Sequence, residues 1–250
     1  KIMRTLKGRP GTALDLTMYR KSEDKVFQLE MKRGKVPLPS LESYYLIDQT
    51  TGYIKINRFS QTTYDEFDTV LNDLISKGML KLILDLRDNQ GGYLLPAKQI
   101  SNALLEKDQT IVVTQSNIGE KEKSKADGNG VFQKGELIVL VNEQTASASE
   151  IVAGAVQDND RGWIIGRRTF GKGLVQQQMP LGGGDAVRLT IAKYFTPSGR
   201  SIQKPYNGDR ETYYEDLSNR YHTGEMGNAE KIPITDSLAF KTPKGRTVYG

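Results

Sequence analysis

Short apolar stretches alternate with amphipathic ones through the middle of the chain, a pattern typical of α/β proteins. Apolar residues at every second position, or in short runs, indicate strands, whereas repeats of three and four indicate helices. The predicted strands are 12–19, 52–59, 80–86, 110–114, 136–141, 163–166, 174–179 and 186–194. The predicted helices are 63–77, 96–105 and 147–158.

The segments outside this pattern are polar. A short apolar stretch near 26–31 precedes the Pro37-Leu38-Pro39 break, and residues 115–130 are expected to form an exposed loop. Thr63 and Glu66 form a capping-box pattern at the start of the first predicted helix. From Thr196 onward the chain is polar and rich in turn residues.

Composition limits the chemistry that the chain can perform. Its 250 residues can bury a good core, so one large domain with an appendage is expected. No apolar run reaches the length of a transmembrane helix. With no cysteine and one histidine, the chain has no thiol chemistry and no disulfide, and the usual bases for a nucleophile are nearly absent.

Basic charge is concentrated at the beginning of the chain. Residues 1–35 hold ten Lys and Arg against four acidic residues. The net charge of this segment therefore exceeds the formal net charge of +5 for the whole chain. Because no aromatic stacking platform accompanies these residues, we interpret them as a solvated face and expect no nucleic-acid partner.

Ser147 and Lys172 are the candidate reactive pair. Ser147 follows a predicted buried strand and begins a helix, where unpaired N–H groups can stabilise an anion. The same Ser-x-x-Glu pattern with Glu150 also describes an ordinary helix cap. Lys172 lies between two glycines, where a surface turn is the simpler interpretation, and a catalytic role requires its amine to be desolvated and neutral.

Three further positions could complete such a site. The N–H of Ala148 and an amide of the Gly91-Gly92 pair could stabilise an oxyanion, although paired glycines usually serve backbone turns. Gln176 is an uncharged group that could orient an amine without restoring its charge. Each of these signals is weak when taken alone.

Taken together, several blocks resemble the carboxyl-terminal processing peptidases, also called tail-specific proteases (serine peptidase family S41). The matching blocks are 85–92, 145–151, 155–158, 169–176 and 194–203, in the family's order and with its spacing between Ser147, Lys172 and Gln176. Arg167 departs from the pattern, because many members carry an acidic residue there.

The resemblance implies a serine endopeptidase that cleaves proteins near their C-terminal tails through an acyl-enzyme. Ser147 would be the nucleophile, Lys172 the general base and acid, and Gln176 the residue that orients Lys172. The amides of Ala148 and Gly92 would form the oxyanion hole, with Gly91 the less favoured donor. Ser149 is not the nucleophile in this pattern, no metal or other cofactor is implied, and Asp158 is assigned a structural role.

The implied fold is α/β, with a crotonase-like (ClpP/crotonase) protease core, a partial PDZ domain at the N-terminus and a β-rich C-terminal part. The corresponding domains are 1–35 as the PDZ remnant, 36–206 as the core and 207–250 as a polar extension. We assign no function to 207–239, and His222 within it is expected to be solvated.

The same resemblance gives the partners and the location. The expected partner is a protein or peptide with a free C-terminal tail, and a second copy of the chain or an adaptor protein remains an alternative. The expected location is periplasmic or otherwise extracytoplasmic, with a membrane anchor in a missing N-terminus.

Two other functions are considered. A penicillin-binding type of acylase would use Ser-x-x-Lys, which occurs at 22–25 and 201–204, but no Lys-Thr-Gly accompanies either. A non-catalytic peptide-binding scaffold of the same fold would not need Ser147, Lys172 and Gln176.

Overall fold

The computed structural model describes residues 2–34, 36, 38–206, 210–232, 234 and 238–249. The chain divides into two compact units, Lys1–Leu38 and Pro39–Gly250. No helix in the described part is long and apolar enough to cross a membrane.

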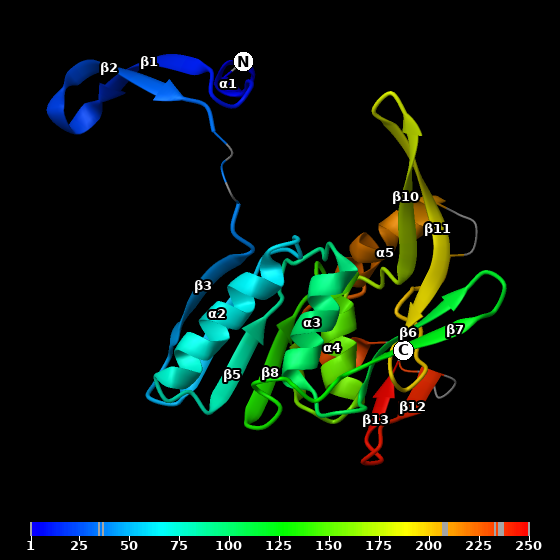
Figure 1. The fold of residues 1–250 in the computed structure, drawn as a ribbon. Helices are drawn as coiled ribbons and strands as arrows, with labels where there is room; N and C mark the ends of the chain where they lie inside the picture. Colours follow the sequence, from blue (N-terminus) through cyan, green and yellow to red (C-terminus); the bar gives the residue numbers. More distant parts are fainter. Residues whose placement is uncertain are drawn as a thin grey trace. The chain divides into compact units, whose positions relative to one another are not determined.

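The first unit is a β-hairpin with a short helix (Figure 1). Helix α1 (Ile2–Leu6) precedes strands β1 (Ala13–Arg20) and β2 (Lys25–Lys32), which pair in antiparallel register. The Arg33 guanidinium donates to the backbone carbonyls of residues in α1 and β1, at 2.7–3.0 Å. One side chain therefore ties the helix to the hairpin, and the strand expected at 12–19 is confirmed.

The second unit is built on a five-stranded sheet in the order β3-β4-β5-β8-β9. Its strands are β3 (Leu41–Leu46), β4 (Thr51–Ile56), β5 (Lys81–Asp85), β8 (Glu136–Val141) and β9 (Trp163–Gly166). Strand β3 is antiparallel to β4, and the other neighbours are parallel. The carboxyl ends of β5 and β8 therefore lie at the same edge, where ligand sites of open α/β sheets occur.

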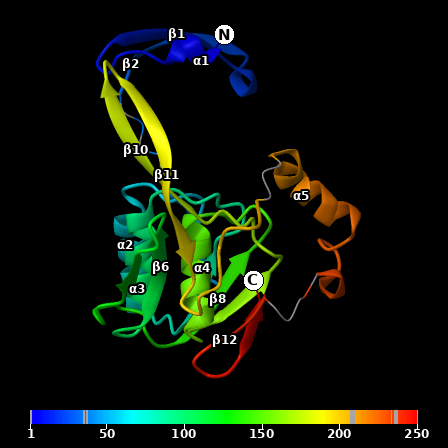
Figure 2. The ribbon, with the colours of Figure 1, turned by 90° about the vertical axis from the view of Figure 1, so that its right-hand side faces the viewer.

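Three helices cover one face of this sheet (Figures 1 and 2). They are α2 (Thr63–Ser76), α3 (Leu94–Leu104) and α4 (Ala148–Asp158). Their apolar faces pack on the strands to form the main core, whose largest fully buried side chains include Ile54, Phe67, Leu84 and Ile100. This α/β arrangement is the predicted one.

A second, antiparallel sheet has the order β10-β11-β6-β7. Its strands are β10 (Leu174–Gly182), β11 (Asp185–Phe195), β6 (Thr110–Ser116) and β7 (Lys121–Lys125). Residues of β6, β11 and α4 form a smaller buried cluster that includes Ile111, Ile151 and Tyr194. Helix α4 thus contributes to both cores, which fixes its position.

The C-terminal part contains helix α5 (Arg210–His222), a 3-10 turn, η2 (Ala229–Lys231), and a small hairpin of β12 (Ala239–Lys241) and β13 (Thr247–Tyr249). Patterning predicted none of α5, β12, β13 or β3. The loop expected at 115–130 was wrong in part, because β7 pairs there with β6 through backbone hydrogen bonds.

The capping box expected at Thr63 is also wrong. Thr62 is the residue that precedes α2, and its hydroxyl donates to Glu66. The Glu66 carboxylate also accepts from the backbone N–H of Ser40 at 2.7 Å. Glu66 therefore ties α2 to the start of β3 instead of closing a cap with Thr63.

Candidate active site

The loops that follow β5 and β8 are hydrogen-bonded to each other at the carboxyl edge of the sheet. Asn142 accepts from the backbone N–H of Asp88 at 2.9 Å and donates to the Asp88 carboxylate at 2.8 Å. The Thr145 hydroxyl donates to the Leu86 carbonyl at 2.9 Å. These bonds place the glycine turn at Gly91 and Gly92 next to the turn that carries Ser147.

Asn89 is the link between the two turns, and it is fully buried. Its side-chain oxygen accepts from the Gly91 N–H, and its amide donates to the Ile56 carbonyl. Its backbone carbonyl accepts from the Ala146 N–H and from the Ser149 hydroxyl, both at 3.0 Å. The Ser149 hydroxyl is thus engaged in a buried hydrogen bond between the two turns.

Ser147 has a strained backbone. Its φ of 57° and ψ of −115° lie outside the usual regions for a residue with a side chain. Strain of this kind persists only where the surroundings hold it in place, and it is frequent at functional sites. Ser147 is half-buried at the start of α4, whereas Ala148 beside it is buried.

Glu150 joins the serine turn to the lysine loop. One oxygen, Oε2, accepts from the backbone N–H of Ser147 at 2.7 Å and from that of Lys172 at 2.8 Å. The other, Oε1, accepts from the Thr169 hydroxyl and from the Gly171 N–H, both at 2.7 Å. Glu150 is therefore far more than a helix cap: four donors converge on its carboxylate.

The Glu150 carboxylate is buried, and its burial affects its pKa. Burial raises the pKa of Glu150, while the hydrogen bonds from Thr169, Lys172, Gly171 and Ser147 act to lower it. Three of the four partners are backbone N–H groups, which can only donate, and the fourth is the Thr169 hydroxyl.

The lysine loop is attached at several points besides Glu150. The Phe170 N–H donates to the Thr145 carbonyl, and the Gly173 N–H donates to the Gln203 side chain. Lys172 itself is exposed, as is Gln176. The expected desolvation of the lysine amine is therefore not found in the structure, because the flanking glycines offer no side chains to cover it.

Gln176 lies at a bulge on β10, where the pairing with β11 shifts between Val175 and Gln176. A bulge redirects the side chain of an edge residue and is common next to active sites. Strand β10 begins two residues after Lys172. The structure therefore brings Ser147, Ala148, Gly91, Gly92 and the Lys172 backbone together, with Gln176 on the adjoining strand.

The two glycines differ in how their backbone groups are used. The Gly91 N–H is engaged by Asn89. The backbone of Phe59 donates to the Gly91 carbonyl and accepts from the Tyr93 N–H. These two bonds do not use the Gly92 N–H. A Cβ on Gly91 would lie 2.8 Å from the Ala148 nitrogen, so the glycine turn abuts the start of α4.

An ion pair between a buried carboxylate and an exposed guanidinium lies at the end of β5. Arg87 binds the Asp85 carboxylate at 2.6 Å, and the Tyr53 hydroxyl donates to it at 2.7 Å. Burial acts to raise the pKa of Asp85, but the hydrogen bonds from Arg87 and Tyr53 outweigh it and lower that pKa. Burial, together with the hydrogen bond to Asp85, raises the pKa of Tyr53 to about 12.

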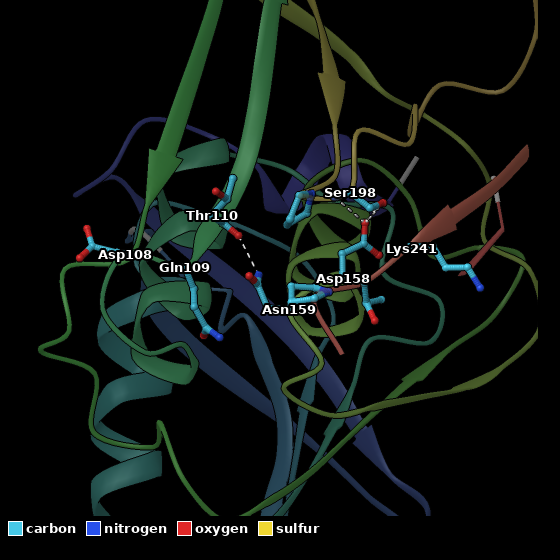
Figure 3. A pocket seen from close by; sticks show the side chains of 10 residues that line it. Asp108, Gln109, Thr110, Asp158, Asn159, Ser198 and Lys241 are labelled. Atoms are coloured by element: carbon cyan, nitrogen blue, oxygen red, sulfur yellow. Dashed lines mark hydrogen bonds between the residues drawn. The ribbon is translucent and has the colours of Figure 1, made fainter. Parts of the chain in front are cut away.

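A cavity lies at the other end of α4 (Figure 3). It measures about 490 Å³ and is lined by residues that include Asp158, Asn159 and Ser198. The buried Asp158 carboxylate accepts from the Ser198 hydroxyl at 2.6 Å and pairs with Arg200 at 3.0 Å. The Asp158 carboxylate is therefore held by partners on the turn that follows β11.

Other expected features can be placed directly. Arg167 pairs with Glu143 at the rim of the serine turn. His222 is exposed at the end of α5. In the described ranges, no group of three or more His, Cys, Asp or Glu side chains is arranged to hold a metal ion.

Sequence reasoning missed the roles of Asn89 and Glu150 as links between loops. Both are polar residues that become fully or almost fully buried, which occurs when every polar group finds a partner. The only signal in the sequence was their position within the two motifs, beside the glycine pair and three residues after Ser147.

A strained serine at a strand-to-helix turn, beside amides that can bind an oxyanion, is typical of serine hydrolases. Comparison with known proteins shows to which family the chain belongs. The model of peptidase family S41 matches residues 50–210, and the chain belongs to this family.

Curated relatives carry the names of C-terminal processing enzymes. The chain is 37% identical over 202 residues to the carboxy-terminal-processing protease of Bartonella bacilliformis, covering 79% of this chain and 46% of the relative. It is 34% identical over 247 residues to the processing protease CtpA of Bacillus subtilis, covering 94% and 52%. The chain thus spans about half the length of the curated relatives it matches.

Solved structures agree with this assignment. The photosystem II D1 C-terminal processing protease aligns with a TM-score of 0.61 and 30% identity, over 78% of this chain and 54% of that one. A putative S41 protease from Bacteroides fragilis aligns with a TM-score of 0.58 at 17% identity, over 89% and 66%, and supports the fold alone.

Proposed function

We propose that the chain is the catalytic part of a serine endopeptidase that cleaves proteins near their C-terminal tails. The observation that carries the proposal is the Glu150 carboxylate, whose single oxygen Oε2 binds the backbone N–H of both Ser147 and Lys172. This contact brings the backbones of two residues 25 positions apart into one site. The names of the curated relatives supply the preference for C-terminal tails.

In this mechanism Lys172 accepts the proton of the Ser147 hydroxyl as the oxygen attacks the scissile carbonyl carbon. The tetrahedral intermediate collapses, Lys172 returns the proton to the leaving amine, and the N-terminal part of the substrate stays as an ester on Ser147. Lys172 then takes a proton from the water that attacks the ester and returns it to the Ser147 oxygen as the ester bond breaks and the acid product leaves. Gln176 orients the Lys172 amine.

The oxyanion is assigned to the N–H groups of Ala148 and Gly92. The first N–H of a helix has no partner within the helix, and the Gly91 N–H is occupied by Asn89. Lys172 is exposed in the chain alone, so bound substrate must supply the desolvation that a neutral amine requires.

Further parts of the proposal concern the type of fold, the location and the substrate. We assign the core to the crotonase-like type and residues 1–35 to the C-terminal remnant of a PDZ domain, the kind of domain that captures such tails. We place the action outside the cytoplasm, and the substrate is a protein with a free C-terminus. One curated relative from Arabidopsis thaliana is named as chloroplastic.

The test is cleavage of an unfolded protein with a nonpolar C-terminal tail, using the parent and the variants Ser147→Ala and Lys172→Ala. Loss of cleavage in both folded variants supports the dyad. Retained cleavage in either variant, or a folded parent that cleaves none of several such tails, contradicts it, and the latter result favours a binding scaffold.

A further inference from the structure

The loop that carries Lys172 is held from two sides. On one side it binds Glu150 of α4. On the other side it binds side chains from α5 and from the turn that follows it, a region to which neither the sequence motifs nor the family comparison gives a role. Residues 168–173 are therefore fixed between two separate elements.

The first attachment from this second side is an ion-pair cluster. Arg220 of α5 donates to the Arg168 carbonyl at 2.5 Å and to the Thr169 carbonyl at 3.3 Å. Glu225 binds both Arg220 and Arg168, each at 2.8 Å. One guanidinium thus binds the backbone of two consecutive loop residues, and one carboxylate holds that guanidinium in place.

The second attachment passes through Lys204. Its backbone N–H donates to the Gly171 carbonyl at 3.0 Å. Its ammonium lies between the rings of Phe170 and Tyr213, at 4.4 and 4.3 Å from their centroids, and binds Asp216 of α5 at 3.1 Å. The residue before Lys172 is therefore also connected to α5.

Arg220 and Glu225 are both buried, whereas the charged side chains of an incidental surface contact stay exposed to water. Arg220 is 3% exposed and Glu225 is 7% exposed, and Arg220 is the only buried side chain among those described in α5. A buried ion pair adds little net stability compared with apolar packing, because both charges lose their hydration. The planar guanidinium instead imposes a defined geometry on the groups it binds.

We propose that α5 and the turn after it are a positioning element of the active site, in which Arg220 and Glu225 hold the 168–173 loop in register with Ser147. Lys204 and Asp216 form a second support for the same loop. These are positioning residues, since they bind the loop and not the reacting atoms. The inference rests on the proposed function, because it assigns the catalytic base to this loop.

The test compares Arg220→Met with Arg246→Met as a matched control. Arg246 also pairs with a carboxylate, Asp160, and donates to a backbone carbonyl, but it does so at the end of α4 remote from Ser147. We expect Arg220→Met to lower kcat on the order of 10- to 100-fold with KM changed by less than about twofold, because a displaced base slows chemistry more than binding. Arg246→Met should leave kcat within about twofold of the parent.

Two milder variants keep the test decisive if Arg220→Met does not fold. Arg220→Lys retains the charge but not the paired donors, and Asp216→Asn weakens only the support through Lys204. Both should lower kcat at unchanged KM. The proposal is overturned if kcat in these variants equals that of the parent, or if it falls no further than in Arg246→Met at the same loss of Tm.

Ser147→Ala and Lys172→Ala are assayed in parallel to separate the two claims. Cleavage that survives either of these changes overturns the proposed dyad itself. Cleavage that both changes abolish, together with parental kcat in the α5 variants, overturns only the role assigned to α5.

Discussion

Glu150 and Lys172 are joined by a hydrogen bond of 2.8 Å, from the lysine backbone N–H to the buried glutamate carboxylate. The same oxygen accepts from Ser147, so the acidic residue that resembles a helix cap in the sequence holds the two halves of the site together. This relationship makes the position of the lysine loop dependent on one side chain of the serine helix.

Replacing Glu150 with Gln should separate these halves. The amide nitrogen cannot accept, so two of the four donors lose their acceptor in a buried place, at a cost of about 1 to 3 kcal/mol in the free energy of unfolding for each unsatisfied group. We expect kcat to fall on the order of 10- to 100-fold. Urea unfolding and steady-state kinetics measure the two effects.

The matched control for Glu150→Gln is Asp158→Asn, a buried carboxylate at the other end of α4. It should lose stability while kcat stays within about twofold of the parent. If both variants lost kcat equally, destabilisation of α4 alone would explain the loss. The link through Glu150 would then not be needed to explain it.

Gly91→Ala should block the proposed oxyanion hole. The new Cβ would lie 2.6 Å from the Ala146 carbonyl oxygen and 2.8 Å from the Ala148 nitrogen, so the serine turn must move. We expect kcat to fall on the order of 10²- to 10³-fold, the effect of losing one oxyanion donor. Steady-state kinetics at saturating substrate gives the value.

Gly119→Ala separates this clash from backbone strain. Gly119 has the same φ of 89°, but nothing lies within 4 Å of its added Cβ. The substitution should lower stability by about 1 to 2 kcal/mol through the left-handed backbone alone and leave kcat unchanged. If Gly91→Ala also leaves kcat unchanged, the contact between Gly91 and the serine turn does not contribute to catalysis.

Asp85 should make stability depend on acidic pH. Its pKa is lowered in the folded chain, so the stabilisation is complete above the ordinary value of about 3.9 and is lost as the pH falls through the lower folded pKa. The difference in unfolding free energy between the parent and Asp85→Asn should therefore be constant from pH 5 to 7. It should shrink below about pH 4.

An Asp85→Asn difference that does not change with pH would mean that the carboxylate charge is not what stabilises the loop after β5.

Several elements with a regular apolar face could be predicted from the sequence, whereas elements without one could not. Strand β8 was predicted with its observed bounds, because Leu137, Val139 and Val141 face the core. Strand β7 alternates Lys with Glu and Ser and is held by backbone bonds to β6. Helix α5 buries a charged side chain, so it has no apolar periodicity to detect.

The candidate site shows the same division. Ser147, Gly91 and Lys172 lie in local motifs whose turns can be inferred from neighbouring residues. The contacts of Asn89 with Ser149, Glu150 with Thr169 and Arg220 with Arg168 join positions that are 19 to 60 residues apart. Such contacts depend on how the loops meet in the folded chain, which no local pattern encodes.

Acylation of Ser147 with Lys172 as its base is tested most directly by mass spectrometry of the protein quenched in acid during cleavage of a tailed substrate. We expect an ester of the substrate's N-terminal part on Ser147 of the parent, absent from Ser147→Ala and from Lys172→Ala. Cleavage without an adduct, or an adduct on another residue such as Ser149, would contradict it.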